Sequence, residues 1–196
     1  MTETSDEVPK WHKHMKFTLS AESLHCVRWW IDTSHNSHED CCGHNGSMMS
    51  LGRGAVLSYS RKQKINTKSS TETELVGTAD ELGMVLWTKY FMAEQGYVLR
   101  KNVVGQDNKS TILLAENGRQ SSSKRTKHIK AKYFFIKDKI KNGDMSLTYC
   151  PADRMWADVL NKPKQGRLFR EFRSHLMDVD LDYDDVRERL ATPEVL

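Results

Sequence analysis

Apolar and polar residues alternate along the chain in a pattern that predicts five β-strands. Each run is rich in bulky or β-branched residues and is bounded by polar or glycine-containing loops. Two of the runs flank Gly52-Arg53-Gly54, so they predict an antiparallel hairpin. The predicted strands are residues 24–33, 47–51, 55–59, 103–105 and 145–149.

Longer segments with apolar residues at three- and four-residue steps predict the helices. The longest lies within residues 68–96, and its apolar positions are Leu75, Ala79, Leu82, Leu86, Tyr90 and Ala93. Shorter helices are predicted at 109–116, 129–141, 155–160 and 166–177. The expected buried side of the helix at 129–141 consists of Tyr133, Phe134, Ile136 and Ile140. This order of elements predicts an α/β fold, a five-stranded mixed sheet with helices on its faces.

Length and composition suit a single folded domain, since the chain has 196 residues of which 38% are hydrophobic. We expect a flexible lead-in over 1–23, the domain and its C-terminal helix over 24–177, and a disordered acidic tail over 178–196. No apolar run approaches the roughly 20 residues of a membrane-spanning helix, and the polar N-terminus lacks the features of a secretion signal. The expectation is therefore an intracellular protein, cytoplasmic or nuclear, with no membrane partner.

Basic residues are concentrated in one part of the chain. The net charge is +4, but the residues before 178 carry 28 basic and 19 acidic side chains. Residues 119–141 include nine Lys or Arg and a single acid, Asp138. A run of one sign favours a polyanionic partner such as nucleic acid over a merely solvated helix face. We expect Arg125, Lys127 and Lys130 to contact phosphates.

Four acidic residues lie where strands end or helices begin. Asp32 is near the end of the first predicted strand, Glu74 lies early in the long helix, Asp107 follows the fourth strand, and Asp158 lies after the fifth. Strand ends and helix starts can converge on one site in such a fold. Carboxylates gathered in one pocket repel one another unless cations neutralise them, so a cluster of the four predicts a magnesium site.

Helix capping is a competing explanation for two of these acids. Thr71-x-x-Glu74 fits a capping box, but Ser69-x-x-Glu72 fits the same box and leaves Glu74 free. Asp107 is also suited to cap the helix that begins near Lys109. The signal for a metal site is therefore the set of acids and not any one member.

Four motifs stand in order along the chain: SSTETEL, QDNKST, SSKRTKHIKAKYFF and YCPADRMWADVLNKP. Together they resemble the ribonuclease H domain of copia-type long-terminal-repeat retrotransposons. That family has a strand ending in Asp, an SSTEAE-like helix start, a DNQS-like strand end, an RTKHI segment and an AD-[IV]-L-T-K-P ending. The resemblance runs from about Leu24 to about Met177 and implies a ribonuclease H-like fold.

The resemblance implies an endonuclease that cuts the RNA strand of an RNA–DNA hybrid. Asp32, Glu74, Asp107 and Asp158 match the family's metal ligands in order, and two Mg²⁺ ions, or Mn²⁺ in their place, would be held there. On physical grounds Asp32 would bridge the two ions. His128 is the nearest candidate for the mobile histidine that helps product leave in some ribonucleases H.

The implied partner is the hybrid itself. The family normally carries this domain at the end of a reverse transcriptase, and nothing resembling that module precedes the domain here. The expectation is therefore an isolated piece or a truncated element.

Two alternatives stay open at this point. The motifs GHNGS, QDNKS and LNKP depart from the family's GHTGG, QDNQS and LTKP without removing a carboxylate, which suits a catalytically inactive, nucleic-acid-binding remnant. A zinc-binding interaction module is less favoured, because adjacent cysteines are poor partners for one tetrahedral ion. Its candidate ligands are His35, His38, Cys41, Cys42 and His44.

Overall fold

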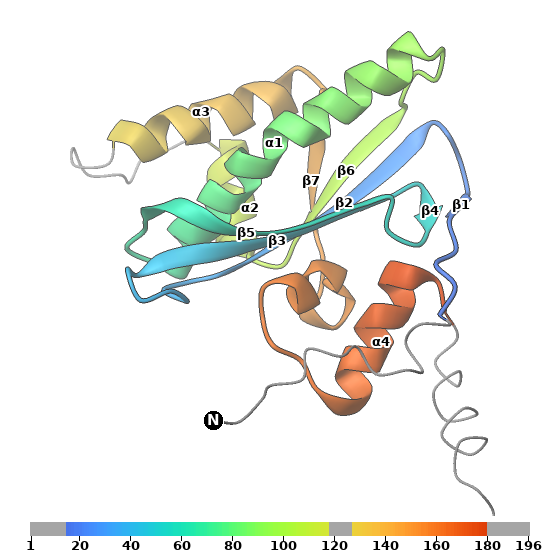
Figure 1. The fold of residues 1–196 in the computed structure, drawn as a ribbon. Helices are drawn as coiled ribbons and strands as arrows, with labels where there is room; N and C mark the ends of the chain where they lie inside the picture. The colour runs from blue at the N-terminus through green and yellow to red at the C-terminus, as the bar shows by residue number, and fades with distance from the viewer. Residues whose placement is uncertain (1–14, 118–126, 180–196) are drawn as a thin grey trace, which may run out of the picture.

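The computed structural model describes residues 15–117 and 127–179 (Figure 1). Side chains are not described at residue 117 or at residues 127–130. In chain order the elements are β1 (Ser20–Ala21), β2 (Cys26–Ser34), β3 (Cys42–Ser50), β4 (Gly52–Arg53), β5 (Leu57–Asn66), α1 (Ser70–Glu94), β6 (Lys101–Gln106), α2 (Lys109–Asn117), α3 (Lys127–Lys141), β7 (Ser146–Tyr149), the 3₁₀ helices η2 (Ala152–Arg154) and η3 (Trp156–Leu160), and α4 (Gly166–Met177).

The main sheet has five strands in the order β5-β3-β2-β6-β7. The β2–β3 and β3–β5 pairs are antiparallel, whereas β6 runs parallel to both β2 and β7. The prediction of a five-stranded mixed sheet with helices is therefore confirmed. Because β2 and β6 are parallel neighbours, their carboxyl ends meet at one edge of the sheet, which brings Asp32 and Asp107 to the same region.

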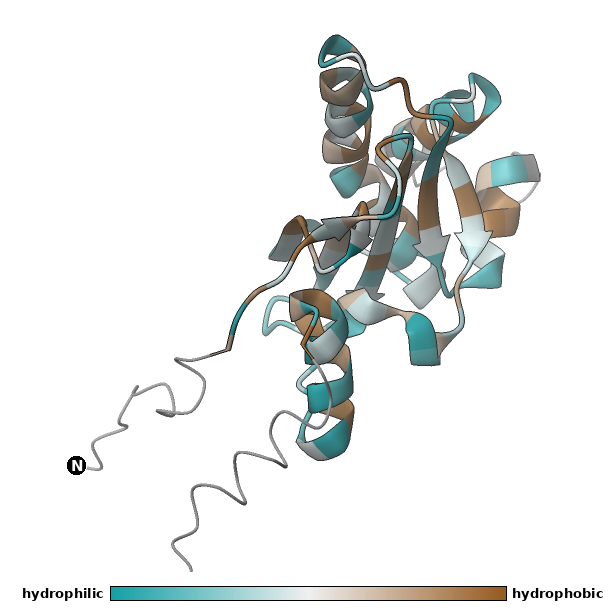
Figure 2. Ribbon diagram, turned by 90° about the vertical axis from the view of Figure 1, so that its right-hand side faces the viewer, coloured by the Kyte–Doolittle hydropathy of each residue, from teal (hydrophilic) through white to brown (hydrophobic). Residues whose placement is uncertain are grey.

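Helices cover both faces of this sheet (Figure 1). Helices α1 and α3 lie on one face, and η3 and α4 lie on the other. Side chains of β2 alternate between the two layers: Trp29 and Ile31 enter the core beneath α1, whereas Trp30 packs against a second, smaller cluster on the other face. That cluster consists of Cys150, Met155 and Ala157. Figure 2 shows hydrophobic segments in brown along the strands of the sheet.

The main core lies between the sheet and the helices α1 and α3. Its fully buried members come from strands and helices that are far apart in the sequence. They include Val27, Trp29, Ile31, Leu82, Val85, Val104 and Ile136. Burying aliphatic and aromatic side chains of this size contributes roughly 1.5–3 kcal/mol each, which makes this layer the main source of stability.

Several strands begin or end at other residues than the sequence predicts. The hairpin strands predicted at 47–51 and 55–59 extend to Cys42–Ser50 and Leu57–Asn66, because backbone pairing with β2 and β3 continues through polar residues. Gly52–Arg53 pairs with Ser20–Ala21, within the segment expected as a lead-in.

Three helical side chains expected to be buried are exposed. Phe134 is 58% exposed, Tyr90 is 52% exposed and Ala93 is exposed as well, so the expectation that they face the core is wrong. Tyr133 and Ile136 are buried as expected, and Ile140 packs against the same core, so three of the four predicted positions on α3 are confirmed. None of the described helices is long and apolar enough to cross a lipid bilayer.

Candidate metal centre

The first turn of α1 is capped in a way that leaves Glu74 free. The Ser69 hydroxyl accepts a hydrogen bond from the N–H of Glu72 at 3.2 Å, and the Glu72 carboxylate accepts one from the N–H of Lys68 at 2.8 Å. The cap is therefore made by Ser69 and Glu72. Glu74 instead faces the end of β2, where its Oε1 accepts a hydrogen bond from the N–H of Thr33 at 3.3 Å.

The start of α2 likewise leaves Asp107 free. Asn108, not Asp107, acts as the cap, because its Oδ1 accepts a hydrogen bond from the N–H of Thr111 at 3.1 Å. Gln106 supports the turn through its Oε1, which accepts from the N–H of Asn108 at 3.0 Å. The Nε2 of Gln106 donates to Oε2 of Glu74 at 3.2 Å, which links the end of β6 to α1.

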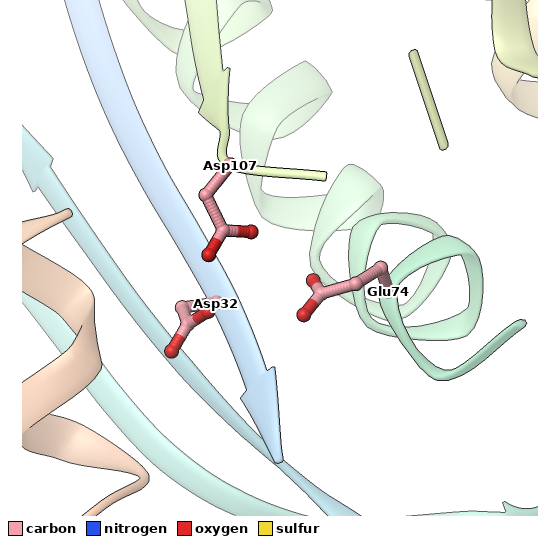
Figure 3. A group of neighbouring side chains, drawn as sticks. All are labelled: Asp32, Glu74 and Asp107. Atoms are coloured by element: carbon pink, nitrogen blue, oxygen red, sulfur yellow. The ribbon is translucent and has the colours of Figure 1, made fainter. Parts of the chain in front are cut away.

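Three carboxylates converge at this edge of the sheet (Figure 3). Asp32 comes from β2, Glu74 from α1 and Asp107 from the residue after β6, and Figure 3 shows their carboxylates turned toward one another. One oxygen from each lies within 4.8 Å of the others. Asp32 and Glu74 are buried and Asp107 is half-buried, so water screens their mutual repulsion poorly.

Burial and mutual repulsion raise the pKa values of these acids. Burial, followed by the charge of Asp32, raises the pKa of Glu74 to about 8. Burial also raises the pKa of Asp32 to about 6, although Lys162 opposes the shift. The pKa of Asp107 is raised by burial as well. Without a cation, the folded chain therefore resists placing full negative charge on all three groups.

The two oxygens of Asp32 have different surroundings. Its Oδ2 accepts hydrogen bonds from Nδ2 of Asn161 at 2.8 Å and from Nζ of Lys162 at 2.9 Å. Its Oδ1 is buried and has no hydrogen-bond partner in the described part of the chain. A buried carboxylate oxygen without a donor is costly. Oxygen donors of this kind are the preferred ligands of Mg²⁺ and Mn²⁺, so the donor set fits a hard divalent cation.

Asp158 lies beside the three-carboxylate group but is not a member of it. It belongs to η3 and shares Lys162 with Asp32, since Nζ of Lys162 is 2.6 Å from Oδ1 of Asp158. Its other oxygen is paired with Lys164. Burial acts to raise the pKa of Asp158, but hydrogen bonds from Lys162 and Lys164 lower it below its usual value.

A glycine allows η3 to approach the strand that carries Asp32. Gly46 of β3 pairs with Asp32 in the sheet, and a Cβ at Gly46 would lie 2.5 Å from the carbonyl oxygen of Ala157. Any side chain at that position would push η3 away from the sheet. The absence of a side chain at Gly46 thus brings Asp158, one residue after Ala157, close to Asp32.

The residues predicted to contact nucleic acid or to help product leave are only partly described. Arg125 lies outside the described residues. Lys127, His128 and Lys130 belong to the first turn of α3, where only the backbone is described. Their roles stay predictions.

The histidines and cysteines proposed as zinc ligands do not converge. His38 and His44 hydrogen-bond each other at 2.9 Å, His35 bonds Thr73, and the Cys42 thiol donates to Asn66. Within the described ranges, the three carboxylates are the one group with metal-site spacing. The zinc-module interpretation therefore lacks a site.

Sequence reasoning missed Gln106, Asn161 and Lys162 as parts of this centre. The first two donate amide hydrogen bonds to Glu74 and Asp32, and the third bridges Asp32 and Asp158. The four-residue spacing of Asp158 and Lys162 was an available signal, because one turn of helix brings such residues together.

Comparisons with known proteins agree with this architecture. No family model matches the chain. The solved structure of LC11-RNase H1, isolated from compost, superposes with a TM-score of 0.50 at 12% identity, covering 69% of this chain and 92% of that one. This match and the sheet order define a ribonuclease H-like fold.

Sequence relatives narrow the assignment. The chain is 30% identical over 160 residues to the retrovirus-related Pol polyprotein from transposon RE1 of Arabidopsis thaliana, which is 81% of this chain. It is also 30% identical over 156 residues, 79% of the chain, to that from transposon RE2 of the same plant. The chain is thus a homologue of copia-type retrovirus-related Pol polyproteins, which confirms the resemblance carried by the motifs. The chain spans 10% of the length of each of these curated relatives.

Proposed function

We propose that the chain is a metal-dependent endonuclease that hydrolyses the RNA strand of RNA–DNA hybrids. The observation that carries the proposal is the convergence of Asp32, Glu74 and Asp107 within 4.8 Å, with one buried oxygen of Asp32 left without a partner among the described residues. A structural role alone does not account for three buried or half-buried acids that repel one another.

The protein's own residues would prepare the reacting phosphodiester in three ways. Asp32, Glu74 and Asp107 would hold a divalent cation, and Asp158 would contribute to a second position, the arrangement expected from the family motifs. Asn161 and Gln106 orient Asp32 and Glu74 by hydrogen bonds, which keeps the carboxylates in one geometry. The bound cations would supply a nucleophilic water at neutral pH and stabilise the leaving oxygen.

The proposed reaction is the hydrolysis of one phosphodiester bond of the RNA strand. A water oxygen attacks the phosphorus, the bond from phosphorus to the 3′ oxygen breaks, and that oxygen takes up a proton. The products carry a 3′-hydroxyl and a 5′-phosphate. A hybrid differs from DNA in the 2′-hydroxyls of one strand and in helix shape, and these features, not base sequence, would select the substrate.

The basic run over 119–141 supports nucleic acid as the partner, since it carries nine Lys or Arg and one acid. Arg125, Lys127 and Lys130 are the proposed phosphate contacts, and His128 is the proposed aid to product release. In the Pol polyproteins to which the chain is related, the matched segment is a small part of a longer protein. We infer that a reverse transcriptase module is the natural companion of this nuclease.

A cleavage assay tests the proposal. The purified chain is incubated with a hybrid whose RNA strand is end-labelled, in Mg²⁺ or in EDTA, next to single-stranded RNA and duplex DNA. RNA fragments are expected from the hybrid in Mg²⁺ alone, and Asp107→Asn should abolish them. Asp144→Asn is the matched control, because Asp144 pairs with Lys89 before β7, away from the strand ends that carry the acids. Binding of the hybrid without cleavage by the wild type would favour the inactive remnant.

A further inference from the structure

Lys162 lies beside two of the four proposed metal ligands but is not itself a proposed ligand. Its Nζ lies 2.9 Å from Oδ2 of Asp32 and 2.6 Å from Oδ1 of Asp158, so one ammonium group joins two acids that are distant in the sequence. The Asp32 side chain is 1% exposed and the Asp158 side chain 11% exposed. Lys164 forms an ion pair with Asp158 and none with Asp32, so Lys162 is the described lysine that bridges the two acids.

The local backbone holds Lys162 in this place. Its N–H donates to the carbonyl oxygen of Asp158 at 2.9 Å, which sets the two residues one helical turn apart. Pro163 follows, and because proline has no N–H, this hydrogen-bonding pattern cannot continue past Lys162. Asn161, the preceding residue, also donates a hydrogen bond to Oδ2 of Asp32.

The two sides of Asp32 therefore differ in charge balance. On one side, Asp32 faces Glu74 and Asp107, and among the described residues neither of those two acids forms an ion pair with a cationic side chain. On the other side, between Asp32 and Asp158, the positive charge is already supplied by Lys162. A single positive charge between two carboxylates balances part of the charge that a divalent cation would balance there.

We propose that Lys162 is a built-in cation at the second metal position, so that the chain without nucleic acid binds one divalent cation, at Asp32, Glu74 and Asp107. This inference rests on the proposed function and assigns a positioning role to a residue outside its ligand set. The ammonium keeps Asp32 and Asp158 together while the substrate is absent. It also repels a second divalent cation from the same oxygens.

Lys162 has room to leave this position when substrate arrives. Its side chain is 42% exposed, and it lines an open groove together with His44 and Ser60. A phosphodiester approaching the acids would offer the ammonium an alternative anion, which would release Asp32 and Asp158. The second cation would then enter together with the hybrid.

Manganese titration of the full chain tests this assignment. Free Mn²⁺ is measured by electron paramagnetic resonance, without nucleic acid, for the wild type and for Lys162→Gln, Lys162→Arg and Lys89→Gln. Glutamine can still donate a hydrogen bond to Asp32 but carries no charge. Arginine keeps the charge, and Lys89→Gln removes the charge of a lysine that pairs with Asp144 at 2.8 Å, outside the centre.

The expected result is one tightly bound Mn²⁺ per wild-type chain. Lys162→Gln should bind a second Mn²⁺ or bind the first at least about tenfold more tightly, because a competing positive charge is gone. Lys162→Arg and Lys89→Gln should match the wild type. The melting temperature in EDTA should fall for Lys162→Gln, and Mn²⁺ should restore it.

Three results would overturn the inference: two Mn²⁺ per wild-type chain, unchanged binding in Lys162→Gln, or weaker binding in that variant. In each of these cases hybrid cleavage by the wild type can still stand. A wild-type chain that binds no Mn²⁺ and cuts no hybrid would instead remove the proposed function together with this inference.

Discussion

The N–H of Thr33 donates a hydrogen bond to Oε1 of Glu74 at 3.3 Å, so the strand end that carries Asp32 is tied directly to the helix that carries Glu74. The contact fixes two proposed ligands relative to each other before any cation binds. Gln106 extends the connection to β6 by donating to the other oxygen of Glu74 at 3.2 Å. Preorganisation of this kind reduces the rearrangement that cation binding requires.

The stability of the metal-free protein should fall as pH rises from 6 to 8. The pKa of Glu74 is raised to about 8 in the folded chain from an ordinary value of 4.5. The folded state therefore keeps a proton that the unfolded state loses, and this advantage disappears as pH rises through 8. The free energy of unfolding in EDTA should drop by about 2 kcal/mol over this range, as measured by urea denaturation.

Glu74→Gln is the control for that pH dependence, because glutamine cannot ionise. The variant should have a flatter stability profile and should be at least as stable as the wild type at pH 8 in EDTA. A wild-type profile without slope between pH 6 and 8 would mean that Glu74 is ionised at low cost in the folded chain.

Asp158→Asn should reduce cleavage less than Asp107→Asn. Asp107 belongs to the three-carboxylate group, whereas Asp158 lies outside it and is neutralised by Lys162 and Lys164. We expect a loss of about tenfold or less for Asp158→Asn and at least about a hundredfold for Asp107→Asn, in kcat/KM for the hybrid. Equal losses would mean that Asp158 contributes as much to cleavage as Asp107 does.

Gly77→Ala should destabilise the protein and weaken cation binding. A Cβ at Gly77 would clash with Cγ2 of Thr33, so α1 and β2 would have to move apart at the contact that holds Glu74. Overpacking of this kind costs about 1–3 kcal/mol, measurable by urea denaturation.

Gly83→Ala, on the same helix, provides the matched control. A Cβ at Gly83 meets nothing within 4 Å, so alanine should stabilise α1 by about 0.5–1 kcal/mol through its higher helix propensity. If both alanine variants had the same effect on stability, close packing at Gly77 would not matter to the site.

The basic segment should determine the salt dependence of hybrid binding. Replacing Arg125 and Lys127 together by Gln should lower the slope of log affinity against log salt concentration by about 1 to 2, because each phosphate contact adds about 0.9. The double variant of Arg100 and Lys101 is the control, since these residues lie at the opposite end of β6 from Asp107. An unchanged slope in the first variant would remove that pair from the interface.

The convergence of Asp32, Glu74 and Asp107 could be expected from the sequence, because Asp32 lies near the end of one strand, Asp107 directly follows another, and Glu74 lies early in a helix. The capping role of Ser69 also predicted that Glu74 would be free, and the structure confirms this. These features depend on local patterns of a few residues, which a sequence displays directly.

The features that the sequence did not predict depend on long-range packing. The bridge from Lys162 to Asp32 spans 130 positions and requires η3 to rest against Gly46. The length of β5, Leu57–Asn66, is set by pairing with β3 and not by its polar side chains. Phe134 has the spacing of a core residue, but none of the described elements covers its side of α3.

The most direct test of the metal centre is an anomalous difference map from crystals grown with Mn²⁺. We expect a peak within about 2.5 Å of carboxylate oxygens from Asp32, Glu74 and Asp107, the three residues whose carboxylates converge. A map without a peak among these three residues, at Mn²⁺ concentrations that support hybrid cleavage, would contradict the account.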